Sequence, residues 1–98
     1  MPIIDFASLA EDLKNPWKSS IIGNVGPAKI KVVRMDQRPL DEETHDYNEA
    51  LLVLDGSLRL QVDGAQITVL PGQMYLAIAG TPHTVLPGSH GTLVIIDV

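Results

Sequence analysis

Short apolar segments separated by closely spaced turn signals are the feature that most limits what this chain can fold into. Asp55-Gly56 and Asp63-Gly64 each suit a tight turn that needs positive φ, and Pro71-Gly72 starts a further turn. The segments between such turns have the length of strands, and many of their residues are β-branched. We therefore predict an all-β sandwich or closed barrel. The expected strands are 19–25, 28–35, 49–54, 57–62, 65–70, 74–78, 83–86 and 92–98. Of these, 49–54, 57–62 and 65–70 are expected to form a meander.

The first residues have a different pattern, which predicts a short helix over 5–14. Asp5 suits the N-cap, Phe6, Leu9 and Leu13 repeat at helical spacing, and Asn15-Pro16 ends the pattern. A chain of 98 residues has the length of one domain. We expect a single domain over 1–98, with the barrel occupying about 19–98.

Composition excludes several classes of function. The formal net charge is −5 and no basic run occurs, so no nucleic-acid partner is expected. No apolar run approaches the roughly 20 residues that span a bilayer, and the first residues do not resemble a signal peptide. The absence of cysteine excludes disulfides and thiolate metal sites. We expect a cytoplasmic protein without a membrane partner.

Two segments are apolar on both faces of the strand that they would form. Residues 50–54 and 93–96 contain no polar side chain to alternate with the apolar ones. One face can fill the barrel, but the other then needs a cover. Because so short a chain has little left to provide it, we predict a homodimer.

A small group of histidines and carboxylates is the candidate site. Glu43 and His45 are two residues apart, so on one strand their side chains would share a face. Glu49 would be about 13 Å from His45 on a straight strand, but a turn at 46–48 would let Glu49 begin the next strand and point back. His83 follows the stiff Gly80-Thr-Pro82 turn. Two imidazoles and a carboxylate with open positions suit Fe(II), and also Mn, Zn, Ni or Cu.

These segments resemble the two motifs of the cupin superfamily. In the first motif His45, Glu49 and Gly56 match the second His, the Glu and the Gly of the family pattern. In the second, Pro71-Gly72 and Gly80-Thr-Pro-His83 match its two turns and its His. The resemblance implies a cupin-like double-stranded β-helix, that is a jelly-roll barrel, here with a short N-terminal helix. Glu43 stands where the family has its first His. The resemblance therefore implies a ligand set of His45, Glu49 and His83. Glu43 would either replace the missing imidazole as a ligand or point into solvent.

The resemblance implies a metal-binding barrel that receives a small organic molecule. Oxygenase, isomerase and decarboxylase activities all occur in such a family, and the sequence does not select among them. The alternative is a non-catalytic ligand-binding or sensor barrel without a functional metal. Tyr47 and Arg34 are the candidate substrate-binding residues, although Arg34 could instead pair with Asp36 or lie on the surface. We expect Trp17 in the core or a dimer contact, and His90 in solvent.

Overall fold

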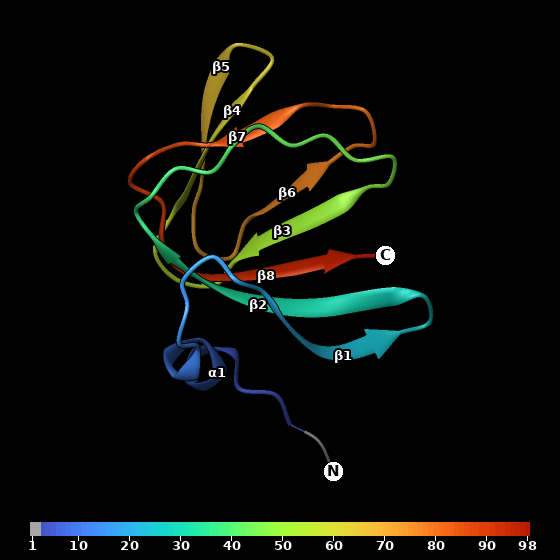
Figure 1. Ribbon diagram of the computed structural model, residues 1–98, viewed down its shortest axis with the longest axis vertical. Helices are drawn as coiled ribbons and strands as arrows, with labels where there is room; N and C mark the ends of the chain where they lie inside the picture. The colour runs from blue at the N-terminus through green and yellow to red at the C-terminus, as the bar shows by residue number, and fades with distance from the viewer. Residues whose placement is uncertain (1–2) are drawn as a thin grey trace.

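The computed structural model describes residues 3–98, which form one helix and eight strands (Figure 1). The helix, α1, begins after its predicted N-cap, since the Asp5 side chain accepts a hydrogen bond from Ser8 N at 3.2 Å. The elements are α1 (Phe6–Asp12), β1 (Ser20–Val25), β2 (Ala28–Asp36), β3 (Glu49–Val53), β4 (Leu58–Val62), β5 (Ala65–Val69), β6 (Met74–Ala77), β7 (His83–Val85) and β8 (His90–Asp97).

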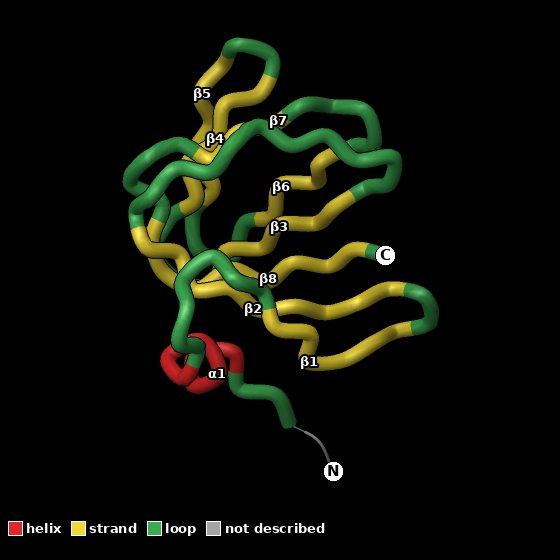
Figure 2. Tube along the Cα trace, in the orientation of Figure 1, coloured by secondary structure: helices red, strands yellow, loops and turns green. Residues whose placement is uncertain are grey.

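The strands form two antiparallel sheets that face each other (Figure 2). The larger sheet has the order β1-β2-β8-β3-β6, and the smaller has the order β5-β4-β7. Helix α1 lies outside the sandwich, next to β2 (Figure 1). The predicted all-β jelly-roll fold with a short N-terminal helix is therefore confirmed.

The predicted meander of the middle three strands is wrong in its first connection. Asp63-Gly64 does form the expected hairpin between β4 and β5. Asp55-Gly56, however, carries the chain from one sheet to the other, because β3 pairs with β6 and β8 while β4 pairs with β5 and β7. Gly56 has φ +76°, and a Cβ there would overlap the His90 carbonyl oxygen. Close backbone approach at this crossing, as well as the turn, requires glycine.

The core fills the space between the two sheets. Leu58 and Leu60 of β4 have no exposed surface, and their side chains alternate with exposed Arg59 and Gln61. Full burial of one leucine side chain stabilises a fold by about 1.5–3 kcal/mol. From the larger sheet the core takes Val33, Met35, Leu51, Val53 and Leu93.

The outer face of the larger sheet is apolar at its β6 edge. Met74 is 54% exposed and Leu76 is 47% exposed. They lie opposite Leu52 and Ala50 of β3, whose side chains share that face. The prediction that β3 is apolar on both faces is thus correct, while the homodimer inferred from it stays a prediction. Within residues 3–98, no helix is long and apolar enough to cross a membrane.

Candidate metal centre

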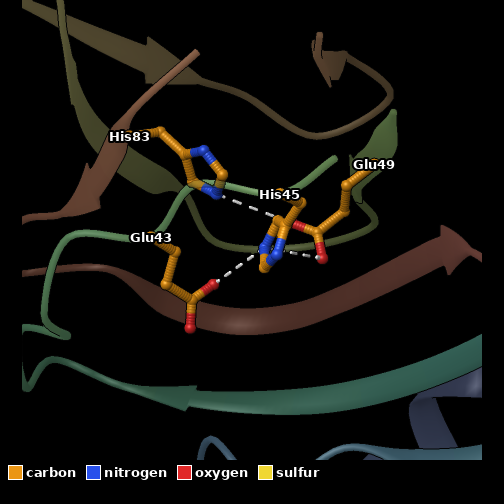
Figure 3. Close-up of side chains that lie close together, drawn as sticks. All are labelled: Glu43, His45, Glu49 and His83. Carbon is orange, nitrogen blue, oxygen red and sulfur yellow. Dashed lines mark ion pairs between the residues drawn. The ribbon is translucent and has the colours of Figure 1, made fainter. Parts of the chain in front are cut away.

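Four side chains converge between the two sheets (Figure 3). Glu49 is the first residue of β3 in the larger sheet, and His83 is the first residue of β7 in the smaller one. Glu43 and His45 come from the segment that precedes β3. One possible ligand atom from each of the four lies within 4.8 Å of the others.

Backbone hydrogen bonds hold the two motifs side by side. Glu43 N donates to His83 O at 2.9 Å, and His83 N donates to Glu43 O at 3.0 Å, which forms a single β-bridge. Gly80 N donates to His45 O at 2.8 Å. The strand expected for Glu43 and His45 is therefore not formed: one bridge and one loop contact, rather than a ladder, place these residues together.

Residues 46–48 act as the expected change of direction before Glu49. The Asn48 side chain accepts a hydrogen bond from Ala79 N at 2.8 Å, so the bend is fastened to the turn that precedes His83. Asn suits this position because its short amide can replace a backbone partner. The bend delivers Glu49 to the larger sheet, and its carboxylate reaches the imidazoles of both His45 and His83.

The contacts within the cluster are those of ion pairs if the histidines are protonated. His45 Nε2 is 3.3 Å from Glu43 Oε2 and 3.8 Å from Glu49 Oε2, and His83 Nε2 is 3.5 Å from Glu49 Oε1. Burial raises the pKa of the Glu49 carboxyl, and the neighbouring Asp97 carboxyl adds to the rise, while the nearby His45 and His83 oppose it.

The imidazole atoms are arranged as ligand atoms would be. His83 Nδ1 lies 3.3 Å from Thr81 O, and because a carbonyl only accepts, the Nδ1–H tautomer would donate there and leave Nε2, which faces Glu49, available to an ion. His45 Nε2 is buried and has no hydrogen-bond partner. Two imidazoles and two carboxylates at this spacing fit a divalent ion. The Glu43 side chain is 52% exposed, so it closes the cluster on its solvent side.

A cavity of about 260 Å³ opens beside the cluster. Tyr47 lines it and stacks on His45, with ring centroids 4.9 Å apart and an angle of 14° between the planes. Desolvation raises the pKa of the Tyr47 hydroxyl, and the charges of Asp97 and Glu49 raise it further. Most of the remaining wall is apolar and includes Val33, Leu40, Leu51, Leu58, Leu93 and Ile95.

Arg34 lies away from this cavity. Its guanidinium donates to the carbonyl oxygens of Leu13 and Lys14, at 3.1 and 3.4 Å. These hydrogen bonds hold the residues that follow α1 against β2. The alternative pairing with Asp36 is not formed, because Asp36 pairs with Arg38. An arginine at an outward position of β2 can reach only the outside of the sandwich.

The other residues singled out from the sequence fall where they were expected. Trp17 packs against the core and also lines the cavity. His90 is exposed, and its Nδ1 lies 3.1 Å from Gly88 O.

Sequence reasoning missed two charged residues of the cavity, Lys31 and Asp97. They form an ion pair, with Lys31 Nζ 2.9 Å from Asp97 Oδ1. The signal was present, because Lys31 is two residues from Val33 on β2 and Asp97 is two from Ile95 on β8. In a strand, that spacing places each charge on the same face as a core residue.

Comparison with known proteins gives the relationships of the chain. A family model described as the Cupin domain matches residues 32–98. The structure is similar to that of a cupin-2 domain containing protein from Shewanella frigidimarina, with a TM-score of 0.89 and 22% identity over 97% of this chain and 93% of that one. A protein from Neisseria meningitidis is similar with a TM-score of 0.85 and 20% identity over 99% of both chains.

A third similar structure, from Rhizobium leguminosarum, is described as of unknown function. Its TM-score is 0.75, with 26% identity over 98% of this chain and 93% of that chain. The search of curated proteins found no match. These similarities establish the fold and do not identify an activity.

Proposed function

This chain belongs to the cupin domain family, and from that premise we propose that it is a metal-binding barrel that receives a small organic molecule. His45, Glu49 and His83 would hold one divalent ion, of Fe, Mn, Zn or Ni, and Glu43 would serve as a fourth ligand. The convergence of four ligand atoms within 4.8 Å is the observation that carries this proposal. The unpartnered Nε2 of His45 supports it, because a bound ion would satisfy that buried atom.

The surroundings of the cluster suit a ligand bound next to the ion. A bound divalent ion would supply Lewis acidity to an oxygen of that ligand. The apolar wall would exclude water, and Tyr47 would keep the His45 ring in place by stacking on it. Oxygenation, isomerisation and decarboxylation are the reactions we propose as candidates, on the strength of the family alone.

Elemental analysis of the purified protein tests the metal directly. We expect close to one divalent ion per chain in the wild type and little in His83→Ala. His90→Ala is the matched control, because it also removes one imidazole but from the exposed first residue of β8. A wild-type protein that is metal-free and does not take up Fe, Mn, Zn or Ni would overturn the proposal.

A second candidate is a ligand-binding or sensor barrel without a functional metal. It is favoured by the contacts of His45 and His83 with Glu43 and Glu49, since these groups can satisfy one another without an ion. It is also favoured by the exposure of Glu43. Under this alternative, His83→Ala would keep both the fold and the binding of a small molecule.

We also propose that the protein is a homodimer. The exposed apolar side chains of Met74 and Leu76 support this, together with the position of β6 as an edge strand that has no neighbour on one side within residues 3–98. Light scattering over a range of concentrations tests it, and a monomer at the highest concentration would refute it. The cytoplasmic location stays a prediction from the sequence.

A further inference from the structure

Buried polar atoms without partners are concentrated in one place. Within residues 3–98, three buried side-chain atoms have no hydrogen-bond partner: Trp17 Nε1, His45 Nε2 and Asp97 Oδ1. All three belong to residues that line the cavity beside the metal cluster. The proposed ion accounts for His45 Nε2, but it leaves Trp17 Nε1 and Asp97 Oδ1 unexplained.

Asp97 and Lys31 form a charged pair on the wall of the larger sheet. Asp97 on β8 lies opposite Lys29 on β2, and Lys31 is its diagonal neighbour two residues along that strand. On the other side of β8, the register that pairs Ile96 with Ala50 places Asp97 next to Glu49. The pair therefore lies on the inner face immediately beside the metal cluster.

The geometry of the pair leaves hydrogen-bonding capacity on both partners. Lys31 Nζ lies 2.9 Å from Asp97 Oδ1 and 3.1 Å from Oδ2, but only the contact to Oδ2 has hydrogen-bond geometry. Oδ1 therefore contacts the ammonium without a well-aligned hydrogen bond, and it can still accept one from another donor. An ammonium group has three N–H donors, so Lys31 can also serve a further acceptor. Because a buried ion pair stabilises a fold no better than packed apolar side chains do, its position in a ligand-sized cavity favours a role in binding.

We propose that the pair of Lys31 and Asp97 anchors a hydroxyl group of a small neutral ligand. A hydroxyl can donate its proton to Asp97 Oδ1 and accept a hydrogen bond from Lys31 Nζ at the same time. This inference rests on the proposed function, since it names the class of ligand for the same cavity.

The charges of the cavity favour a neutral ligand over an acid. Three carboxylates, those of Glu43, Glu49 and Asp97, line it together with the single ammonium of Lys31. A divalent ion would bring this set to neutrality, so a ligand carboxylate would add an uncompensated negative charge next to buried Asp97. The volume of about 260 Å³ equals that of about nine waters at about 30 Å³ each. That space suits one small ring with a substituent, against the apolar wall.

Three probes with the same ring separate the possibilities: phenol, which carries a hydroxyl, fluorobenzene, which has nearly the same shape without one, and benzoate, which carries a charge. Binding would be measured by NMR titration of the full-length protein, both metal-free and zinc-loaded. We expect phenol to bind at least about tenfold more tightly than fluorobenzene, because it gains a hydrogen bond to a charged group. We expect benzoate to be the weakest of the three. Equal binding of phenol and fluorobenzene, a preference for benzoate, or no binding of any probe would overturn the inference.

Substitutions test whether Lys31 and Asp97 cause the tighter binding of phenol than of fluorobenzene. Asp97→Asn should abolish most of the advantage of phenol, and Asp12→Asn should leave it unchanged although it removes the same negative charge from an exposed position. Because Lys31→Met alone would leave Asp97 buried without its partner and could unfold the protein, the double variant Lys31→Met/Asp97→Leu is the second test. It should stay folded and bind fluorobenzene at least as well as phenol. A double variant that still prefers phenol would refute the role of the pair.

The two proposals can fail separately. If the protein takes up no metal but the preference for phenol depends on Lys31 and Asp97, the anchoring role stands and the metal centre does not. If it takes up one ion per chain and shows no such preference, the metal centre stands and the anchoring role is wrong.

Discussion

Replacing His83 by alanine should remove most of the thermal stabilisation that a divalent ion gives to this protein. A ligand that binds only the folded state stabilises it by about 2.7 kcal/mol at a concentration of 100 times its Kd. In a domain of this size, 1 kcal/mol changes the melting temperature by about 4–8 °C. Saturating ion should therefore raise the Tm of the wild type by about 10–20 °C.

The structure indicates how much of this increase His83 controls. Its side chain is 4% exposed, and its Nε2 faces the other members of the cluster. Loss of a residue that only supports a ligand already weakens metal binding about 10–100-fold, so loss of a ligand itself should cost at least about 100-fold. At the same ion concentration the stabilisation then falls to about 0.4 kcal/mol, and the increase in Tm to about 2–3 °C.

The assay is differential scanning calorimetry of each protein with and without Zn²⁺ or Mn²⁺. The quantity compared is the metal-induced change in Tm, so any loss of stability from the substitution itself cancels. His90→Ala should show the full wild-type increase. A His83→Ala protein whose Tm rises with metal as much as that of the wild type would refute the role of His83 as a metal ligand.

Other features of the structure give three further predictions. Gly56→Ala should lower the free energy of unfolding by about 3 kcal/mol or more, because its Cβ would overlap the His90 carbonyl. Gly64→Ala, also at positive φ but with open space around its Cβ, should cost only about 1 kcal/mol in the same urea titration. Glu43→His should shift metal preference from Mn²⁺ towards Zn²⁺ and Ni²⁺ in competition binding, since imidazole suits these ions better than carboxylate does; unchanged preference would mean that Glu43 is not a ligand. The raised pKa of Glu49 means that the folded metal-free protein binds a proton more tightly than the unfolded chain. The stabilising contribution of Glu49 should therefore be fully present below the unfolded pKa and be lost as pH rises through the folded pKa, and Glu49→Gln should remove this loss in urea titrations across pH. If the free energy of unfolding of Glu49→Gln falls equally steeply with pH, the fall does not come from Glu49.

Local signals in the sequence were sufficient for most of the fold. The N-cap at Asp5, the hairpin at Asp63-Gly64 and the strand segments depend on nearest neighbours along the chain, so they could be predicted. The connection at Asp55-Gly56 could not, because the same dipeptide suits a hairpin turn and a crossing between sheets. The distinction depends on the approach of the Gly56 backbone to His90, which is distant in sequence.

The candidate site also contains residues that the sequence predicted and residues that it did not. His45, Glu49 and His83 were recognised from the spacing of turns and donors, and the structure brings them together with Glu43. Arg34 was named as a candidate for ligand binding, with pairing to Asp36 or a surface position as alternatives, because a strand of mixed composition does not reveal which of its faces is inside. The structure places it on the outside, where it binds the carbonyl oxygens of Leu13 and Lys14.

The sequence by itself determined which segments become strands, where several turns lie and which donor atoms can meet, because these properties follow from local conformational preference and the two-residue period of a strand. Only the tertiary structure decided that β3 and β4 belong to different sheets and that Lys31 and Asp97 share the cavity with the metal cluster. Both depend on the pairing of strands far apart in the chain. Pairing of that kind is selected by packing of the whole core, and a local pattern indicates at most the face of its strand on which each residue lies.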